Sequence, residues 1–168
     1  MNQVIKVYKQ QVPAMKFVGK KYVGDDVYSH WGEWFANGWF DKVEEAMGGV
    51  DNILNIWKDG GGYVGLEFRK EGELLEYWIG MFATTDTVVP EGFECVQFEP
   101  GNIGVCWNYG EEDEVHDVGN NWKYILKDGM EFKLDERGYV AQFENGLCPR
   151  FTTPYDGNVI LDYCFYVK

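Results

Sequence analysis

Short extended segments and a helix-like segment alternate along the first half of the chain. Residues 12–22 mix β-branched and aromatic side chains with charged ones, which is typical of a strand. From Ser29 to Met47 apolar residues recur at helical spacing, and two glycines follow as a helix stop, so the pattern predicts an amphipathic helix that is interrupted by Gly32 and Gly38. Residues 63–68 and 74–82 then form two short apolar runs, which predict a β-hairpin.

The same order of elements begins again in the second half. Residues 84–92 have the composition of a linker, and 93–107 form a long extended stretch that is broken near a Pro-Gly pair. A shorter helix is predicted over 115–125, and a closing strand over 159–167. Residues 130–146 show no pattern that decides between helix, strand and loop.

The two closing strands can be aligned with each other. Residues 74–81 match residues 160–167, with Glu76-Tyr77 on Asp162-Tyr163, and the same offset brings 17–22 onto another strand-like segment. A chance alignment of amphipathic strands is the alternative, but two strands at one offset favour duplication. We therefore predict an α+β fold with a tandem strand-helix-strand-strand repeat, in which repeat one spans about 1–83 and repeat two about 93–168.

Composition and charge narrow the partners. The 168 residues suit a single domain, aromatic residues make up 17%, and the formal net charge is −13. Such a surface repels phosphate, so we expect no direct nucleic-acid binding and no membrane binding, and it favours cationic partners. No segment has the apolar length of a signal peptide or membrane span, which predicts a cytoplasmic location.

Few residues suggest a metal site, a cofactor or a known catalytic motif. The cysteines are Cys95, Cys106, Cys148 and Cys164, without CxxC spacing, and we expect reduced thiols. Only two histidines occur, so no metal site is predicted. GxSxG, P-loop, GxGxxG and HExxH motifs are absent from the sequence, and we expect no cofactor.

Several segments together resemble a known family. These are the strand 75–82 with Gly80, the segment 89–92, the helix with Trp122 and the ending 155–167. In this order they resemble the GyrI-like small-molecule-binding domain, the effector-binding domain of AraC-type and MerR-type drug-responsive regulators. The resemblance covers most of the chain. It implies two modules with pseudo-twofold symmetry, antiparallel sheets with helices on the outer face, and a central ligand cleft.

The resemblance also implies a charged residue for the ligand and a set of partners. In drug-binding members a carboxylate on the last strand meets the positive charge of the ligand, and Asp162, shorter than the usual glutamate, stands there. The family's regulators carry a helix-turn-helix domain, for which this chain leaves no residues. We therefore expect any DNA-binding or enzyme partner to act in trans. We expect the chain itself to be a monomer or a homodimer. Some stand-alone relatives sequester toxins, restrain gyrase or hydrolyse cyclopropane-bearing compounds.

Strand alternation separates the two faces of the closing strand. It sends Leu161 and Tyr163 to a face that we assign to the helix-covered core, and Asp162 and Tyr166 to the cleft, where Glu76 of the matching strand joins them. A solvated acid or a core aromatic is the competing interpretation for each. The predicted ligand-binding residues are Asp162, Glu76, Trp78, Trp107, Tyr166, Tyr109 and Trp39.

A carboxylate among aromatic rings suits cationic chemistry, because ring faces attract positive charge. The sequence thus predicts binding of cationic, aromatic or lipophilic small molecules, for sensing or sequestration. One alternative is a hydrolase of reactive electrophiles that uses Asp162, Glu76 and Tyr166. Another alternative is a protein-interaction module that modulates an enzyme such as gyrase.

Overall fold

The chain folds around one eight-stranded antiparallel sheet. The computed structural model describes residues 3–117, 120–146, 150–151 and 156–168. The strands are β1 (Gln3–Val12), β2 (Met15–Val23), β3 (Val64–Arg69), β4 (Glu76–Ala83), β5 (Glu94–Phe98), β6 (Gly101–Gly110), β7 (Val140–Asn145) and β8 (Val159–Val167). The predicted hairpin is β3–β4, and β8 has the predicted bounds.

The helices are short. They are η1 (Val27–His30), α1 (Trp31–Ala36), α2 (Trp39–Ala46), α3 (Asp51–Leu54), η2 (Val115–Asp117) and α4 (Asn121–Lys127). The helix predicted from Ser29 to Met47 is divided between η1, α1 and α2, with a break at Gly38 as predicted but not at Gly32, which lies within α1. Gly38 has φ 64°, a left-handed conformation that ends α1 and starts α2 in a new direction.

The strand order has twofold symmetry. It runs β1-β6-β8-β7-β3-β4-β2-β5, and when each strand of one repeat is exchanged for its equivalent in the other, the same order results, read from the opposite edge. The centre lies between β7 and β3, where Leu66 is opposite Phe143. The α+β class with a repeated unit is confirmed, and the sheets of the two repeats are joined into a single sheet.

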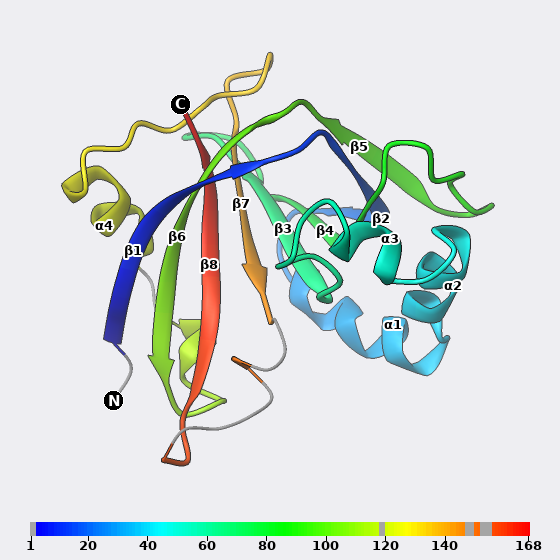
Figure 1. Cartoon of the computed structure of the whole chain (residues 1–168), viewed down its shortest axis with the longest axis horizontal. Coiled ribbons are helices and arrows are strands. Elements are labelled where there is room, and N and C mark those ends of the chain that lie inside the picture. The colour runs from blue at the N-terminus through cyan, green and yellow to red at the C-terminus, as the bar shows by residue number, and fades with distance from the viewer. Residues whose placement is uncertain (1–2, 118–119, 147–149, 152–155) are drawn as a thin grey trace.

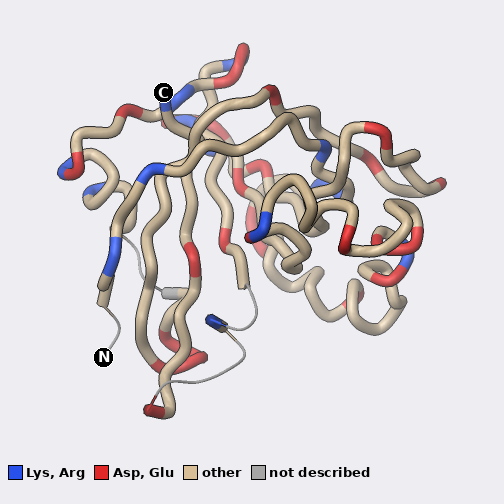
Figure 2. The backbone as a smooth tube through the Cα atoms, in the orientation of Figure 1, with Lys and Arg blue, Asp and Glu red and all other residues tan. Residues whose placement is uncertain are grey.

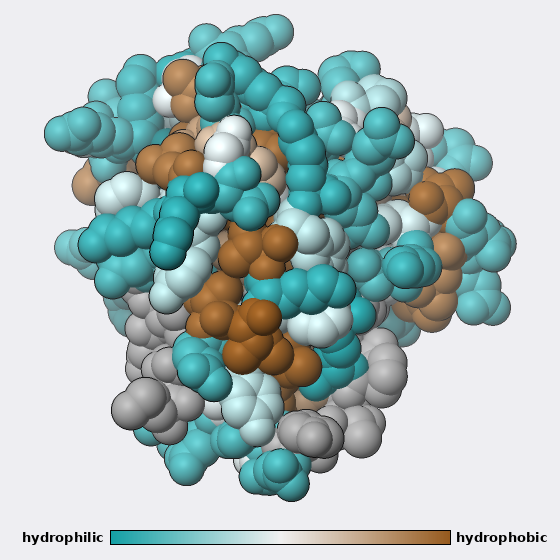
Figure 3. Space-filling view, turned by 60° about the vertical axis from the view of Figure 1, so that its left-hand side comes forward, coloured by the Kyte–Doolittle hydropathy of each residue, from teal (hydrophilic) through white to brown (hydrophobic). Residues whose placement is uncertain are grey.

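Each repeat has two strands before its helix: β1 was not predicted, whereas β5 and β6 correspond to the extended stretch predicted over 93–107 with its break near the Pro-Gly pair. β1 crosses to the half formed by the second repeat and pairs with β6, while β5 crosses the other way and pairs with β2 (Figure 1). These two strands form the edges of the sheet. Figure 3 shows the side on which β1 lies, where apolar residues form a central strip and hydrophilic ones surround it.

The sheet curls so that its inner face closes on an aromatic core. Phe98 of β5 stacks on Tyr166 of β8, with ring centroids 4.6 Å apart, although these strands are far apart in the sheet order. Phe82 and Phe143 lie in the same core. We call this the inner face. We call the opposite face, which carries Tyr77 and Tyr163, the outer face.

Both helical segments pack on the outer face. Trp34 of α1 donates a hydrogen bond to Tyr22 of β2, and α4 packs against Cys106 of β6 through Ile125. A gap between these two helical groups leaves the middle of the outer face open, over β3, β7 and β8. None of the described helices has the length and apolarity that a membrane crossing would need.

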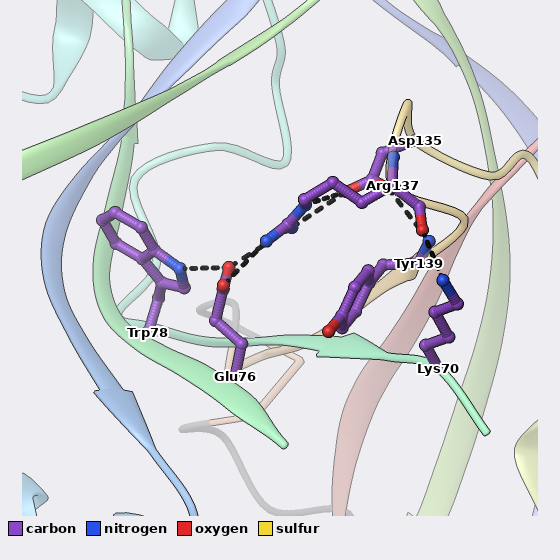
Figure 4. A network of polar contacts seen from close by, with 6 residues as sticks. All are labelled: Lys70, Glu76, Trp78, Asp135, Arg137 and Tyr139. Atoms are coloured by element: carbon purple, nitrogen blue, oxygen red, sulfur yellow. Dashed lines mark hydrogen bonds and ion pairs between the residues drawn. The ribbon is translucent and has the colours of Figure 1, made fainter. Parts of the chain in front are cut away.

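Segment 130–146, for which the sequence predicted no element, contains β7 and, before it, a turn that contacts repeat one. Arg137 in this turn donates to Glu76 of β4 at 2.8 Å and to Asp135 at 2.9 Å (Figure 4). Its guanidinium also lies 4.4 Å from the centre of the Tyr139 ring. The cluster thereby fixes the turn of repeat two against repeat one.

Candidate functional site

A cleft of about 1330 Å³ lies on the outer face, between the helical groups of the two repeats. Its floor comes from β3, β4, β7 and β8, one wall from the helices of repeat one, and the other wall from residues around η2. Aromatic side chains line it on both sides: Tyr28, Trp31, Phe35, Tyr63 and Tyr77 from repeat one, and Phe151 and Tyr163 from repeat two. The cleft is therefore large and aromatic enough to enclose a drug-sized molecule.

The charged side chains of the cleft are mostly acidic. The acids are Glu44, Glu67, Glu112 and Glu144. Lys58 and Arg69 are the lysine and arginine among the lining residues, and His116 is also present. Figure 2 shows that acidic residues are spread over both halves of the molecule as well, in keeping with the net charge of −13. The field in the cleft favours a positively charged ligand.

Two acid-tyrosine pairs occupy equivalent places in the two repeats. Glu67 of β3 lies opposite Tyr77 of β4, and Glu144 of β7 lies opposite Tyr163 of β8. Across the central strand pair, Glu67 faces Gln142 while Glu144 faces Gly65. The two acids are thus diagonal neighbours on one face, roughly 7–8 Å apart between Cα atoms.

Glu67 is the most enclosed of these acids, with 7% of its surface exposed. Its Oε1 accepts a hydrogen bond of 2.7 Å from the Tyr28 hydroxyl. Its Oε2 accepts one of 2.7 Å from Arg69 Nε and one of 3.1 Å from Gln142 Nε2. Gln142 also donates to the Tyr163 hydroxyl at 2.7 Å. A single hydrogen-bonded network therefore joins the acid of one repeat to the tyrosine of the other.

The tyrosines of the cleft stay protonated at neutral pH. Burial, together with the hydrogen bond to Glu67, raises the pKa of Tyr28 to about 12. Burial also raises the pKa of Tyr77 and Tyr163. Tyr77 accepts a hydrogen bond of 2.7 Å from Trp31 Nε1, so its own proton is available to an acceptor. These phenols supply aromatic faces and neutral polar groups to a ligand.

Glu144 is the more accessible acid. Its Oε2 lies 3.1 Å from Nδ1 of His116, and the ring of His116 lies edge-on to Phe151. His116, for which the sequence predicted no part in ligand binding, thus lies in the cleft wall.

Comparison with solved structures shows the fold. SAV2435 bound to tetraphenylphosphonium is similar, with a TM-score of 0.68 and 14% identity, over 98% of this chain and 94% of that one. A protein from Staphylococcus aureus MU50 described in terms of transcription regulation has a TM-score of 0.64 and 13% identity, over 98% and 99%. A hydrolase from Listeria innocua has a TM-score of 0.51 and 15% identity, over 97% and 92%.

No protein-family model matches the chain, and no curated protein matches its sequence. At these identities the likeness shows that the chain shares the fold of these proteins.

The predicted orientation of the closing strand is reversed. Leu161 and Tyr163 line the cleft, whereas Asp162 points to the inner face and is 2% exposed. Arg150 donates to its two oxygens at 3.1 and 2.7 Å and lies 4.7 Å from the centre of the Trp107 ring. Burial raises the pKa of Asp162 even though Arg150 lowers it. An arginine 12 residues away in the chain therefore satisfies this acid.

The other predicted ligand residues also lie outside the lining of this cleft. Glu76 is held by Arg137 and by Trp78 Nε1, and Trp107 donates to Tyr8. Their partners are protein groups. Tyr109, Tyr166 and Trp39 complete this set: Tyr109 accepts from Asn158, Tyr166 is in the inner core, and Trp39 lies below the ammonium of Lys20. A direct role of the seven residues in ligand binding stays a prediction.

The three residues named for a hydrolase do not form one group. Asp162 of β8 pairs with Asn145 of β7, which pairs with Val64 of β3, and Val64 pairs with Gly80 of β4. Asp162 and Gly80 are therefore three strand spacings apart, which is roughly 14 Å across the sheet. Glu76 lies four residues further along β4. Asp162 and Glu76 therefore cannot act on one water molecule in this arrangement.

The described residues contain no group of three or more His, Cys, Asp or Glu side chains arranged to hold a metal ion. Cys95, Cys106 and Cys164 are free thiols, and Cys148 lies outside the described residues.

Proposed function

We propose that the chain binds cationic, aromatic or lipophilic small molecules in the outer-face cleft, as a GyrI-like sensing or sequestering domain. The observation that carries the proposal is the pair of acid-tyrosine units, Glu67 with Tyr77 and Glu144 with Tyr163, placed symmetrically on the cleft floor. A structural neighbour that binds tetraphenylphosphonium supports it.

Aromatic rings and carboxylates favour the same ligands for complementary reasons. Each ring face attracts a cation by roughly 0.5–2 kcal/mol and excludes water at the same time. In the drier environment an ion pair at about 4 Å is worth about 4 kcal/mol, compared with about 1 kcal/mol in water. Delocalised organic cations gain most, because they lose little hydration when they enter.

Binding of tetraphenylphosphonium tests the proposal, with intrinsic tryptophan fluorescence as the readout because Trp31 lines the cleft. We expect Glu67→Gln and Glu144→Gln each to weaken binding by about tenfold, equivalent to about 1.4 kcal/mol. Glu91→Gln, at an exposed position in the linker, is the matched control and should bind like the wild type.

A neutral ligand of related shape, triphenylphosphine oxide, separates charge from shape. Its affinity should change less than twofold in the Gln variants, which retain the size of the side chain. Equal losses for the neutral and the cationic ligand, or no tetraphenylphosphonium binding by the wild type, would refute the proposal. A DNA-binding or enzyme partner in trans stays a prediction.

A further inference from the structure

Glu67 already has a cationic partner inside the protein. Of its three hydrogen-bond donors, Tyr28 and Gln142 are neutral, and Arg69 is the one cationic side chain in the described residues that pairs with it. Arg69 is two residues further along β3, on the same face. An incoming cation must share Glu67 with this guanidinium or displace it.

Arg69 is held less firmly than the other two arginines. Arg150 grips Asp162 through two nitrogens and is 24% exposed, and Arg137 bridges two acids over an aromatic ring. Arg69 makes one short contact with Glu67, through Nε, and its Nη2 is 3.5 Å from the Tyr28 hydroxyl. Half of its side chain, 50%, is exposed, which resembles the 48% of Arg137, so the difference between these two arginines lies in the number of acids that each one holds. A cation that takes the place of the guanidinium at Glu67 can therefore release it into solvent.

Arg69 also separates the cleft from a second chamber. This chamber, of about 530 Å³, lies beside α4 and is lined by Trp122, Phe132 and Phe165 among others. Arg69 and Tyr163 line both hollows. Arg69 and Tyr163 therefore lie at the boundary between the two hollows.

We propose that Arg69 is a built-in counter-cation that occupies the place of the ligand's positive charge at Glu67, and that a bound cation displaces it. This inference rests on the proposed function and adds a residue that sets affinity and ligand size. Small cations would compete with Arg69 alone, whereas larger lipophilic cations would also gain contacts in the second chamber once Arg69 has moved.

The test is Arg69→Gln, which removes the charge and retains a polar side chain. The loss of a competing half-exposed ion pair of up to about 1 kcal/mol should tighten tetraphenylphosphonium binding by up to about fivefold. Lys70→Gln is the matched control, because it makes the same change in net charge beside the second chamber, where Lys70 bonds to the Arg137 carbonyl and not to Glu67. It should change the affinity less than twofold.

A double variant shows whether Arg69 acts through Glu67. In a Glu67→Gln background, Arg69→Gln should no longer tighten binding, and this result would support the inference. Equal effects of Arg69→Gln and Lys70→Gln, or tightening that persists without Glu67, would overturn it while the proposed function stands. If neither the wild type nor Arg69→Gln binds the cation, the proposed function fails and the inference fails with it.

Discussion

Gly65 lies on the cleft floor where a side chain has no room. A methyl group there would overlap the Tyr77 hydroxyl and lie 3.0 Å from Tyr77 Cζ. Tyr77 is buried, and its hydroxyl accepts the 2.7 Å hydrogen bond from Trp31. Gly65→Ala must therefore push a core ring and disturb the contact that holds α1 over β4.

The expected cost follows from these two effects. Overpacking in a well-packed core costs about 1–3 kcal/mol, and loss of the hydrogen bond adds about 1 kcal/mol. We expect Gly65→Ala to lower the free energy of unfolding by about 3 kcal/mol. For a chain of this size that corresponds to a decrease in Tm of roughly 6–12 °C.

Removal of the obstructing hydroxyl should rescue part of this loss. Tyr77→Phe alone should cost about 1 kcal/mol, because Trp31 Nε1 loses its acceptor. The double variant should be at least about 1 kcal/mol more stable than the sum of the single effects predicts. The rescue is partial because the ring carbon stays close to the new methyl group.

Urea unfolding followed by tryptophan fluorescence and circular dichroism measures these differences. Gly32→Ala is the control, because a methyl group on this glycine of α1 meets no atom within 4 Å, and it should leave stability unchanged or raise it by up to about 1 kcal/mol. A Gly65→Ala protein within about 0.5 kcal/mol of the wild type, or strict additivity with Tyr77→Phe, would show that the packing argument is mistaken.

Two further predictions concern the acids that the sequence analysis favoured. Burial acts to raise the pKa of Glu76, but hydrogen bonds from Arg137 and Trp78 outweigh it and lower the pKa. The ionised Glu76 therefore stabilises the fold at pH values above its pKa in the unfolded chain, and this stabilisation is lost as the pH falls through its lower pKa in the folded state. In urea titrations Glu76→Gln should lower the free energy of unfolding by about 1 kcal/mol at pH 7 and change it little below about pH 3. Asp162→Asn should change tetraphenylphosphonium affinity less than twofold, and a tenfold loss in the same fluorescence assay would restore Asp162 as the ligand's partner.

Local patterns predicted the elements whose partners are close in sequence. β8 is a nearly continuous apolar and aromatic run and has its predicted bounds, and the β3–β4 hairpin follows from two apolar runs joined by a short turn. The crossing strands β1 and β5 could not be placed in the same way, because each pairs with a strand of the other repeat. β7 was not predicted either. It is a short run of mixed residues, and the turn before it is fixed by the contact of Arg137 with Glu76 of the other repeat, which the local sequence does not show.

The chemistry of the cleft was predictable, but its residues were not. Alternation divides a strand into two faces and does not say which face opens to a ligand. Here both faces bury apolar side chains: Tyr166 and Phe143 lie inside the curl, and Leu161 and Phe165 lie on the outer face. The sequence therefore placed Asp162 in the cleft, because strand alternation does not show that Arg150, outside the strand, pairs with it inside the curl.

The duplicated acid-tyrosine motif nevertheless indicated the right place in the fold. In Glu76-Tyr77 and Asp162-Tyr163 the two neighbours point to opposite faces, so the tyrosines enter the cleft while those acids do not. The acids that join the tyrosines come from β3 and β7, and only the cross-strand register reveals them. The symmetry is then broken by their partners, Arg69 at Glu67 and His116 at Glu144. A guanidinium therefore competes with a ligand for Glu67, whereas the neighbour that a ligand meets at Glu144 is an imidazole ring.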